Sequence, residues 1–367
     1  MQTDLPTEHR TSDLSRHALV WALVGTAVGA LLLWTQGVAV GGPDGMLQVG
    51  PQSSLRPVVE RELGQVPVSP TGGHDGQISF GIAVDLSGDE VAPLLGDAAG
   101  YRYRRVLYPA LASLFGVLSG PPVLWMMFGL AAVGMGLATA GIQMLADQMR
   151  APVLVVLAVL ANPGVWLGVR VLTPDALGLG LALLGLAFAA RRSDRTAIAL
   201  LAAAALTKEQ FLLVAIGVAI WCLLDRERVR AVLYFVAPAV PLAVWSLVLS
   251  ARLGGGFDPR NSLDIPGRGI VRAIPNWALA QVDGILAWLT LALVIGTAVA
   301  LLRSRSRFAA SIAWPWIVLA LLSSSAVWEF GNNSLRALAI LAPLLALAIW
   351  GSSDPASARI NWRSIGD

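Results

Sequence analysis

Apolar runs recur along this chain from Ala18 to Trp350 and are separated by short charged segments. The runs are 16 to 26 residues long, and a helix needs about 20 apolar residues to cross a bilayer. A soluble domain of this length would instead alternate apolar and polar positions with the period of each element. The pattern therefore predicts an all-α, polytopic helical membrane protein.

The first run, 18–40, follows a polar N-terminus of mixed charge and is too long for a typical signal-peptide core. No clear cleavage site follows it, so we interpret it as an uncleaved transmembrane helix. We expect a cytoplasmic tail (1–17), one integral membrane domain (18–350) and a second cytoplasmic tail (351–367). No low-complexity tract and no second, soluble domain is expected.

Three compact loops are rich in arginine, namely 191–195, 225–230 and 303–307. The positive-inside rule places all three loops on the cytoplasmic side of the membrane. We expect this membrane to be the cell membrane of a bacterium. Counting crossings from these loops predicts about ten transmembrane helices and two long outer loops, 41–120 and 251–284. The predicted crossings are 18–40, 121–146, 151–169, 173–190, two short helices within 196–224, 230–250, 285–302, 308–327 and 335–350.

The segment 196–224 begins and ends at basic loops, so it crosses the membrane an even number of times. Its 29 residues fall short of the about 40 that two full crossings need. We therefore predict two short helices that meet at the polar TKEQ, with Lys208 and Glu209 on the wall of an outward-facing cavity. The alternative is a longer loop in which both side chains reach the outer water.

Part of the first outer loop, 106–118, is apolar but would span only about 20 Å as a helix. We expect it to form a helix at the outer membrane interface. The stretch HDGQISFGIAV before it predicts a second short helix. There Asp75 is either the N-cap residue of that helix or a general base near a low-dielectric interface. His74 is a second base, a metal ligand or a polar neighbour.

The outer face collects the other polar groups of interest. Thr173, Pro174 and Asp175 make a complete helix start, with Thr173 as the N-cap residue. Asp175 could also complete a metal or substrate site with Asp75. The segment YRYRR, 101–105, supplies three arginines, which either snorkel toward lipid headgroups or bind a phosphate in bidentate fashion.

Other classes of chemistry lack their signatures. The positive charge comes almost wholly from arginine, since Lys208 is the only lysine, and it is explained by basic inner loops without any nucleic-acid partner. Cys222 stands alone in an apolar run, so no disulfide framework or thiolate metal cluster is expected. Nucleotide-binding loops, GxSxG and HExxH are absent from the sequence. Energy for a reaction would arrive with the substrate.

Taken in order, these motifs resemble the GT-C glycosyltransferases, among them the protein mannosyltransferases and the lipid A aminoarabinose transferases. The likeness covers about residues 18–350, from the early Asp75 through YRYRRVLYP, TPDALGLG and ALTKEQ to NSLRALAILAP. DGQ followed by YRYRRVLYP is similar, more narrowly, to bacterial multi-pass proteins of cell-surface glycopolymer formation. The chain departs from many relatives in having Gly-Gln after the first Asp.

The resemblance implies transfer of a sugar from a polyprenyl-phosphate donor to a cell-envelope glycan, glycolipid or protein on the outer face. It implies that Asp75 is the catalytic base, and that Asp175 is a second acidic residue that positions the acceptor or a metal. Lys208, Arg104, Arg105 and Arg336 would bind the lipid phosphate. Further predicted substrate-binding residues are Gln77, Arg102, Tyr108 and Glu209. A divalent cation, Mg or Mn, stays open, with Asp75, Asp175 and His74 as candidate ligands.

Two other functions compete with this hypothesis. A transporter or flippase of lipid-linked sugars would carry polar residues on both sides of the membrane midplane, whereas the helix interiors here are nearly uncharged. A non-catalytic lipid-binding subunit of a glycopolymer assembly complex would keep the fold and lose the activity.

Overall fold

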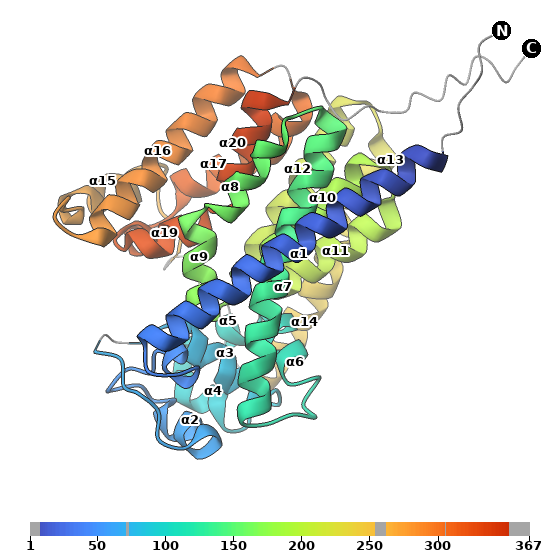
Figure 1. Ribbon diagram of the computed structural model, residues 1–367. Helices are drawn as coiled ribbons and strands as arrows, with labels where there is room; N and C mark the ends of the chain where they lie inside the picture. Colours follow the sequence, from blue (N-terminus) through green and yellow to red (C-terminus); the bar gives the residue numbers. More distant parts are fainter. Residues whose placement is uncertain (1–7, 71–72, 254–261, 305, 352–367) are drawn as a thin grey trace, which may run out of the picture.

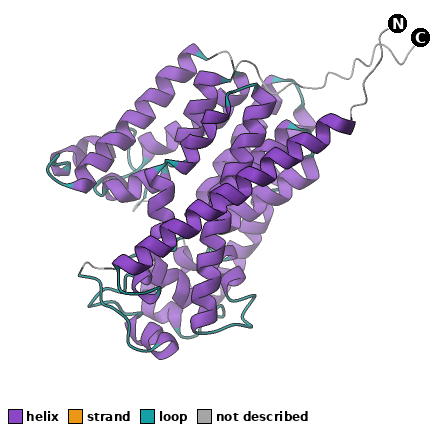
Figure 2. Cartoon of the chain, in the orientation of Figure 1, coloured by secondary structure: helices purple, strands orange, loops and turns teal. Residues whose placement is uncertain are grey.

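The computed structural model describes residues 8–70, 73–253, 262–304 and 306–351. The described residues form helices, and their only extended pairings are two isolated bridges, Val49 with Val68 and Leu263 with Ser323 (Figure 2). The predicted all-α class is therefore confirmed. The predicted C-terminal tail lies outside the described residues from 352 onward, as do residues 1–7 of the predicted N-terminal tail, and the first helix already begins at Glu8 within that tail.

Four stretches of helix are long and apolar enough to cross a membrane. They lie in α1 (Glu8–Ala39), α7 (Pro121–Met149), α13 (Arg228–Val236) continued by α14 (Ala239–Leu253), and α16 (Val282–Arg303). The number rises to six if two bent helix pairs each count as one span. The coarse prediction of a helical membrane protein thus agrees with the lengths and composition of the observed helices.

The two bent pairs occur where the sequence predicts single crossings. The first joins Val153–Leu160, which ends in α8 (Leu157–Leu160), to α9 (Pro163–Arg170) with a bend of 44°. Pro163 cannot donate a backbone hydrogen bond, and the Asn162 carboxamide accepts from Gly164 N instead. The second pair joins α19 (Gly331–Ala337) to α20 (Leu341–Trp350) with a bend of 55°.

The short helices in the middle of the chain agree with the two short helices that we predict between the basic loops, within 196–224. Thr207 ends α11 (Asp194–Thr207), and α12 (Leu212–Leu224) follows after a single 3-10 turn, Glu209–Phe211. Lys208 lies at the break in an extended conformation, so two short helices meet at TKEQ as predicted. The other short apolar helices are α10 (Asp175–Ala190) and α17 (Arg307–Leu322).

Small helices of the segment 41–120 gather at one end of the bundle, the lower end in Figure 1. They are α2 (Arg56–Leu63), α3 (Asp75–Val84), α4 (Val91–Leu95), α5 (Ala99–Tyr103) and α6 (Leu107–Ala112). Two further short helices, α15 (Arg268–Ala273) and α18 (Ser325–Trp328), precede and follow α16 and α17 in the chain. Leu55, Ile82, Tyr103 and Leu249 belong to a small apolar core that joins α3 and α5 to α14.

The predicted interfacial helix over 106–118 is wrong in its second half. Helix α6 ends at Ala112, and Leu114 and Phe115 adopt positive φ values of 47° and 59°. The Ser113 carbonyl accepts from the amides of Gly116, Val117 and Leu118, which turns the chain back on itself. A tight turn therefore replaces the helix end, and it exposes 71% of Phe115.

Close helix packing brings α7 against its neighbours. A Cβ atom on Gly134 would overlap the backbone of Leu177 in α10, and one on Gly136 would overlap Ala22 in α1. Small residues at such contacts let helix backbones approach closely inside a membrane. Helix α7 thus forms the central support against which α10 carries Asp175.

The basic loops lie together at the opposite end of the bundle. Arg230 pairs with Asp194 at 2.8 Å, and Arg192 pairs with Glu227, so ion pairs join the loop after α10 to the loop after α12. The end of α16, at Arg303, lies at the same upper end in Figure 1. This arrangement separates the arginine-rich loops from the segment 41–120.

Candidate functional site

Asp75 is the first residue of α3, and His74 takes the N-cap position without a side-chain capping bond. Gly76 lies so close to Val171 that an added Cβ would overlap the Val171 carbonyl oxygen. The start of α3 therefore rests on the turn between α9 and α10, which carries Asp175. The alternative role of Asp75 as an N-cap residue is not the one that the structure shows.

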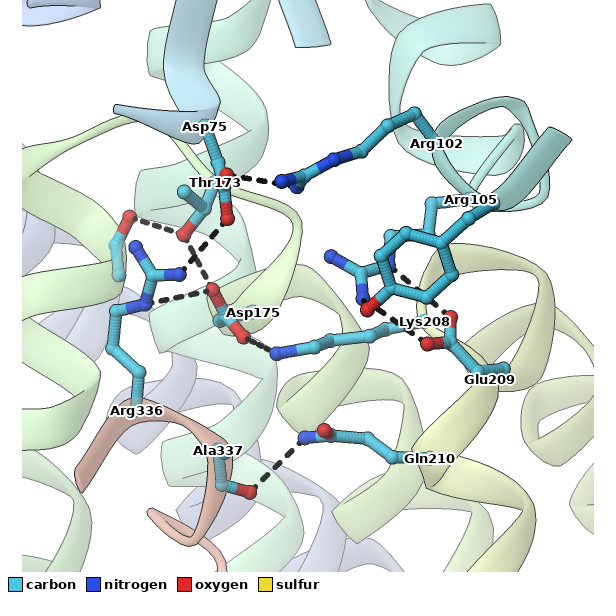
Figure 3. Close-up of polar contacts among 12 residues, drawn as sticks. Asp75, Arg102, Arg105, Thr173, Asp175, Lys208, Glu209, Gln210, Arg336 and Ala337 are labelled. Atoms are coloured by element: carbon cyan, nitrogen blue, oxygen red, sulfur yellow. Dashed lines mark hydrogen bonds and ion pairs between the residues drawn. The ribbon is translucent and has the colours of Figure 1, made fainter. Parts of the chain in front are cut away.

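The Asp75 carboxylate faces two arginines from distant parts of the chain (Figure 3). Arg102 Nη1 donates to Oδ1 at 2.8 Å, and Arg336 Nη2 donates to Oδ2 at 3.1 Å. Burial by itself raises the pKa of Asp75, but the positive charges of Arg102 and Arg336 outweigh it and hold the pKa below its usual value. Asp75 is thus an ionised carboxylate in a cationic setting.

Asp175 begins α10 and lies directly behind this pair. Lys208 Nζ donates to Oδ1 at 2.5 Å, and the Thr173 hydroxyl lies 2.6 Å from Oδ2. Arg336 Nε lies 3.5 Å from the same Oδ2, so one guanidinium bridges the two aspartates. Thr173 therefore holds the Asp175 side chain, and the predicted N-cap role of Thr173 is wrong because Pro174 occupies that position.

A second ion pair joins the segment 41–120 to the break between α11 and α12. Arg105 Nη2 donates to Glu209 Oε1 at 3.1 Å, and Arg105 Nε donates to Oε2 at 3.2 Å. The Tyr101 ring packs on the Arg105 guanidinium with 4.5 Å between them, and Arg105 Nη2 also contacts the Tyr101 hydroxyl. This two-point contact fixes the position of α5 relative to Lys208.

Most of these groups line one cavity of about 580 Å³, whereas Asp175 and Thr173 are not among its lining residues. Its charged lining residues are Asp75, Arg102, Arg105, Lys208, Glu209 and Arg336. Helices α12 and α17 add an apolar wall of Leu212, Leu213, Ile216 and Leu319. The cavity therefore offers a compact charged region and an apolar surface to the same ligand.

The charge of the cluster favours an anionic ligand. Arg102, Arg105, Lys208 and Arg336 face the carboxylates of Asp75, Asp175 and Glu209, which leaves one positive charge in excess. Arginine and lysine donors around an oxygen-rich anion are the usual means of binding phosphate. A divalent metal does not fit here, because both aspartates are already ion-paired and the described residues contain no group of three or more His, Cys, Asp or Glu ligands.

Three of the predicted substrate-binding residues lie away from the cavity, and the predicted second acidic residue, Asp175, lies behind its lining. Tyr108 is fully buried, and its hydroxyl donates to the Met127 carbonyl at 3.1 Å. The Gln77 carboxamide oxygen accepts from Ser53 Oγ at 2.7 Å under α3, and Arg104 is not a lining residue. Tyr108 and Gln77 thus support the site from behind, a role that their spacing in the sequence does not reveal.

His74 precedes Asp75 but is not among the residues that line the cavity. Burial, followed by the positive charge of Arg336, holds the pKa of His74 below its usual value. The imidazole is therefore neutral at neutral pH. This protonation state assigns no task to His74.

Several lining residues were not predicted. Tyr101 and Gln210 belong to the motifs YRYRR and TKEQ. Their position next to predicted site residues is the sequence feature that could indicate them. Asn333 lies in α19, three residues before the predicted Arg336. The apolar wall gave no signal, because its leucines are of the same type as residues that face lipid.

Comparison of the chain with family models, with curated proteins and with solved structures gives no match. The geometry of the site therefore carries the functional argument.

Proposed function

We propose that this protein is a membrane glycosyltransferase of the GT-C type. It moves a sugar from a polyprenyl-phosphate donor to a cell-envelope glycan, glycolipid or protein acceptor. The observation that carries the proposal is the cavity of about 580 Å³, in which paired cations and carboxylates share a lining with an apolar wall. An amphipathic ligand with a phosphate, a polar group and a hydrocarbon chain satisfies all three surfaces.

The cations have the chemistry to bind the donor phosphate and to stabilise it as it leaves. Lys208 and Arg336 each expose only 8% of the side chain, yet both line the cavity. Electrostatic stabilisation by such preorganised donors is strongest where water is excluded. Arg102 approaches the same region from α5.

Asp75 is the proposed general base. It takes the proton of the acceptor hydroxyl while the acceptor oxygen forms a bond to the anomeric carbon. The bond from that carbon to the phosphate oxygen breaks, and the electron pair leaves with the lipid phosphate. The pKa of Asp75 is low because the positive charges of Arg102 and Arg336 outweigh the effect of its burial. A bound phosphate that draws these arginines away would raise this pKa and strengthen the base.

The membrane arrangement is part of the proposal. The described helices supply four to six candidate spans by length and composition, and we propose about ten crossings when the shorter apolar helices are included. The basic loops and both termini then lie in the cytoplasm of a bacterial cell. The charged cavity, at the opposite end of the bundle, then opens toward the outer face.

One observation also favours a protein that binds the donor lipid without reaction. Each carboxylate of the cluster is already ion-paired, as expected of a lipid-binding subunit in a glycopolymer assembly complex. A non-catalytic subunit would bind a polyprenyl-phosphate sugar and release no lipid phosphate. The two proposals therefore separate on turnover.

The test is incubation of the purified protein with a panel of polyprenyl-phosphate sugars, with membrane glycolipids as acceptors. The proposal predicts acceptor-dependent release of polyprenyl phosphate. Binding without release assigns the subunit role, and absence of both contradicts the proposed function.

A further inference from the structure

Four uncharged polar residues form a second polar part of the cavity, and we call them the neutral wall. They are Gln210, Ser262, Ser323 and Asn333. Two hydrogen bonds join members of the wall to the direct neighbourhood of other members. Gln210 Nε2 donates to the Ala337 carbonyl at 3.0 Å, one helical turn from Asn333 in α19, and the Ser262 carbonyl accepts from Ser324 N at 2.9 Å.

The neutral wall is set apart from Asp75. Figure 3 shows Gln210 and Ala337 on the side of Lys208 away from Asp75 and Arg102. Among the described residues, the Gln210 carboxamide oxygen and the Asn333 carboxamide have no hydrogen-bond partner, although both residues line the cavity. Carboxamides both donate and accept, which suits the hydroxyl groups of a sugar.

A cationic sugar meets no available counter-charge in this cavity. Asp75 is paired with Arg102 and Arg336, and Glu209 is paired with Arg105. Asp175 behind them is paired with Lys208. An ammonium group would have to break one of these pairs and would be repelled by the excess positive charge of the cluster.

An anionic sugar is also disfavoured on this wall. The cations of the cluster lie around Asp75, Asp175 and Glu209, where the proposed donor phosphate binds. Gln210, Ser262, Ser323 and Asn333 carry no charge, so a carboxylate placed against them would lose water without gaining a cation. A carboxylate placed among the cations would compete with the phosphate for the same donors.

We propose that the transferred sugar is uncharged, a hexose or pentose whose hydroxyl groups hydrogen-bond to the neutral wall. This inference rests on the proposed function, because it names the sugar of the same donor. Sites built to hydrogen-bond a neutral group discriminate strongly against analogues that leave polar groups unpaired. Asn333 and Gln210 are then specificity-determining residues.

The test compares three donors on one fixed polyprenyl phosphate: a neutral hexose, a 4-amino pentose and a hexuronic acid. We expect acceptor-dependent release of polyprenyl phosphate from the neutral donor to be at least about tenfold faster than from the other two. Equal or faster release from the amino or uronic donor overturns this inference and leaves the proposed function standing. If the protein is folded, as its melting transition shows, and still neither binds nor turns over any of the three donors, both proposals fail.

A charged variant of the neutral wall sharpens the comparison. Asn333→Asp is nearly isosteric and adds a carboxylate for an ammonium group, so it should raise the relative rate of the amino donor over the neutral donor about tenfold. Asn276→Asp is the matched control, because Asn276 is exposed and does not line the cavity. The same shift in both variants, or none in Asn333→Asp, contradicts the assignment of Asn333.

Discussion

Arg336 Nη2 donates to the Asp75 carboxylate across 3.1 Å, although 261 residues separate the two in the chain. The contact brings the start of α3, in the segment 41–120, onto α19 near the end of the chain. Arg102 binds the other oxygen of the same carboxylate at 2.8 Å. The ionisation of Asp75 therefore depends on two cations from different segments.

The pH dependence of kcat/KM reports this ionisation in the free protein. Arg102 and Arg336 lower the pKa of Asp75 below 3.8 against the effect of burial. The wild-type rate should therefore show no acid limb from Asp75 above about pH 5. Arg102→Gln removes one cation, so the pKa rises and protonation inactivates the base at higher pH. If the Arg102→Gln variant shows no acid limb at higher pH than the wild type, the pairing is contradicted.

The lowered pKa of Asp75 also predicts how the stability of the folded protein depends on pH. A carboxylate whose folded pKa is lowered contributes stability above its unfolded pKa of 3.8, and the contribution is lost as pH falls toward the folded pKa. Between pH 5 and pH 8, a window above about that pKa, the stabilisation from Asp75 should therefore be fully present, and the melting temperature should not change with pH through Asp75. Arg56→Gln is the control, because Arg56 pairs with Glu60 on the surface of the same segment.

The buried pair of Lys208 and Asp175 should behave as one unit in unfolding. Lys208→Met leaves the Asp175 carboxylate with the Thr173 hydroxyl and with Arg336 at 3.5 Å. Removal of one partner of a buried ion pair costs about 3–5 kcal/mol. The double variant Asp175→Asn/Lys208→Met should recover much of the melting temperature in detergent while losing donor binding. Additive losses in the double variant contradict the coupling.

The apolar wall should sense the length of the donor lipid. Ile216→Trp narrows the cavity at α12, so it should raise KM for a long polyprenyl donor more than KM for a short-chain analogue. Ile220→Trp is the matched control one turn further along, because Ile220 is 37% exposed and does not line the cavity. Equal effects of the two variants contradict the assigned path of the chain.

The orientation of the bundle can be measured with single cysteines. Cys222 is buried and can be replaced by serine as the background. In intact cells, a membrane-impermeant thiol reagent should label Asp97→Cys in the segment 41–120. It should label Val229→Cys, at an 86% exposed position within the basic segment 225–230, only after permeabilisation. The reverse pattern contradicts the positive-inside assignment.

Much of the fold follows from the apolar pattern and from the even number of membrane crossings required between two basic loops. The short length of 196–224 between two basic loops predicted the break at Lys208, and the structure has it there. The same counting placed Asp75, Asp175, Lys208 and Arg336 at one end of the bundle, where ion pairs now join them. Their functional roles remain predictions.

The missed features depend on contacts between distant segments. Tyr108 follows the arginine motif closely, yet α6 turns its hydroxyl to the Met127 carbonyl. Arg105 finds Glu209 across 104 residues, and no local pattern indicates such a partner. The apolar composition around Leu114 and Phe115 predicts helix, because it does not reveal that the Ser113 carbonyl accepts from three successive amides.

The central claim is that Asp75 accepts the proton of the acceptor hydroxyl, and Asp75→Asn tests it most directly. The carboxamide keeps the shape of the side chain but cannot act as a base, and loss of a general base typically costs about 10²–10⁴ in rate. Asp97→Asn is the control, since Asp97 is an exposed aspartate on the same segment. The measurement is acceptor-dependent release of polyprenyl phosphate by equal amounts of each membrane-inserted variant. The account predicts loss of release in Asp75→Asn with donor binding retained, and full release in that variant would contradict it.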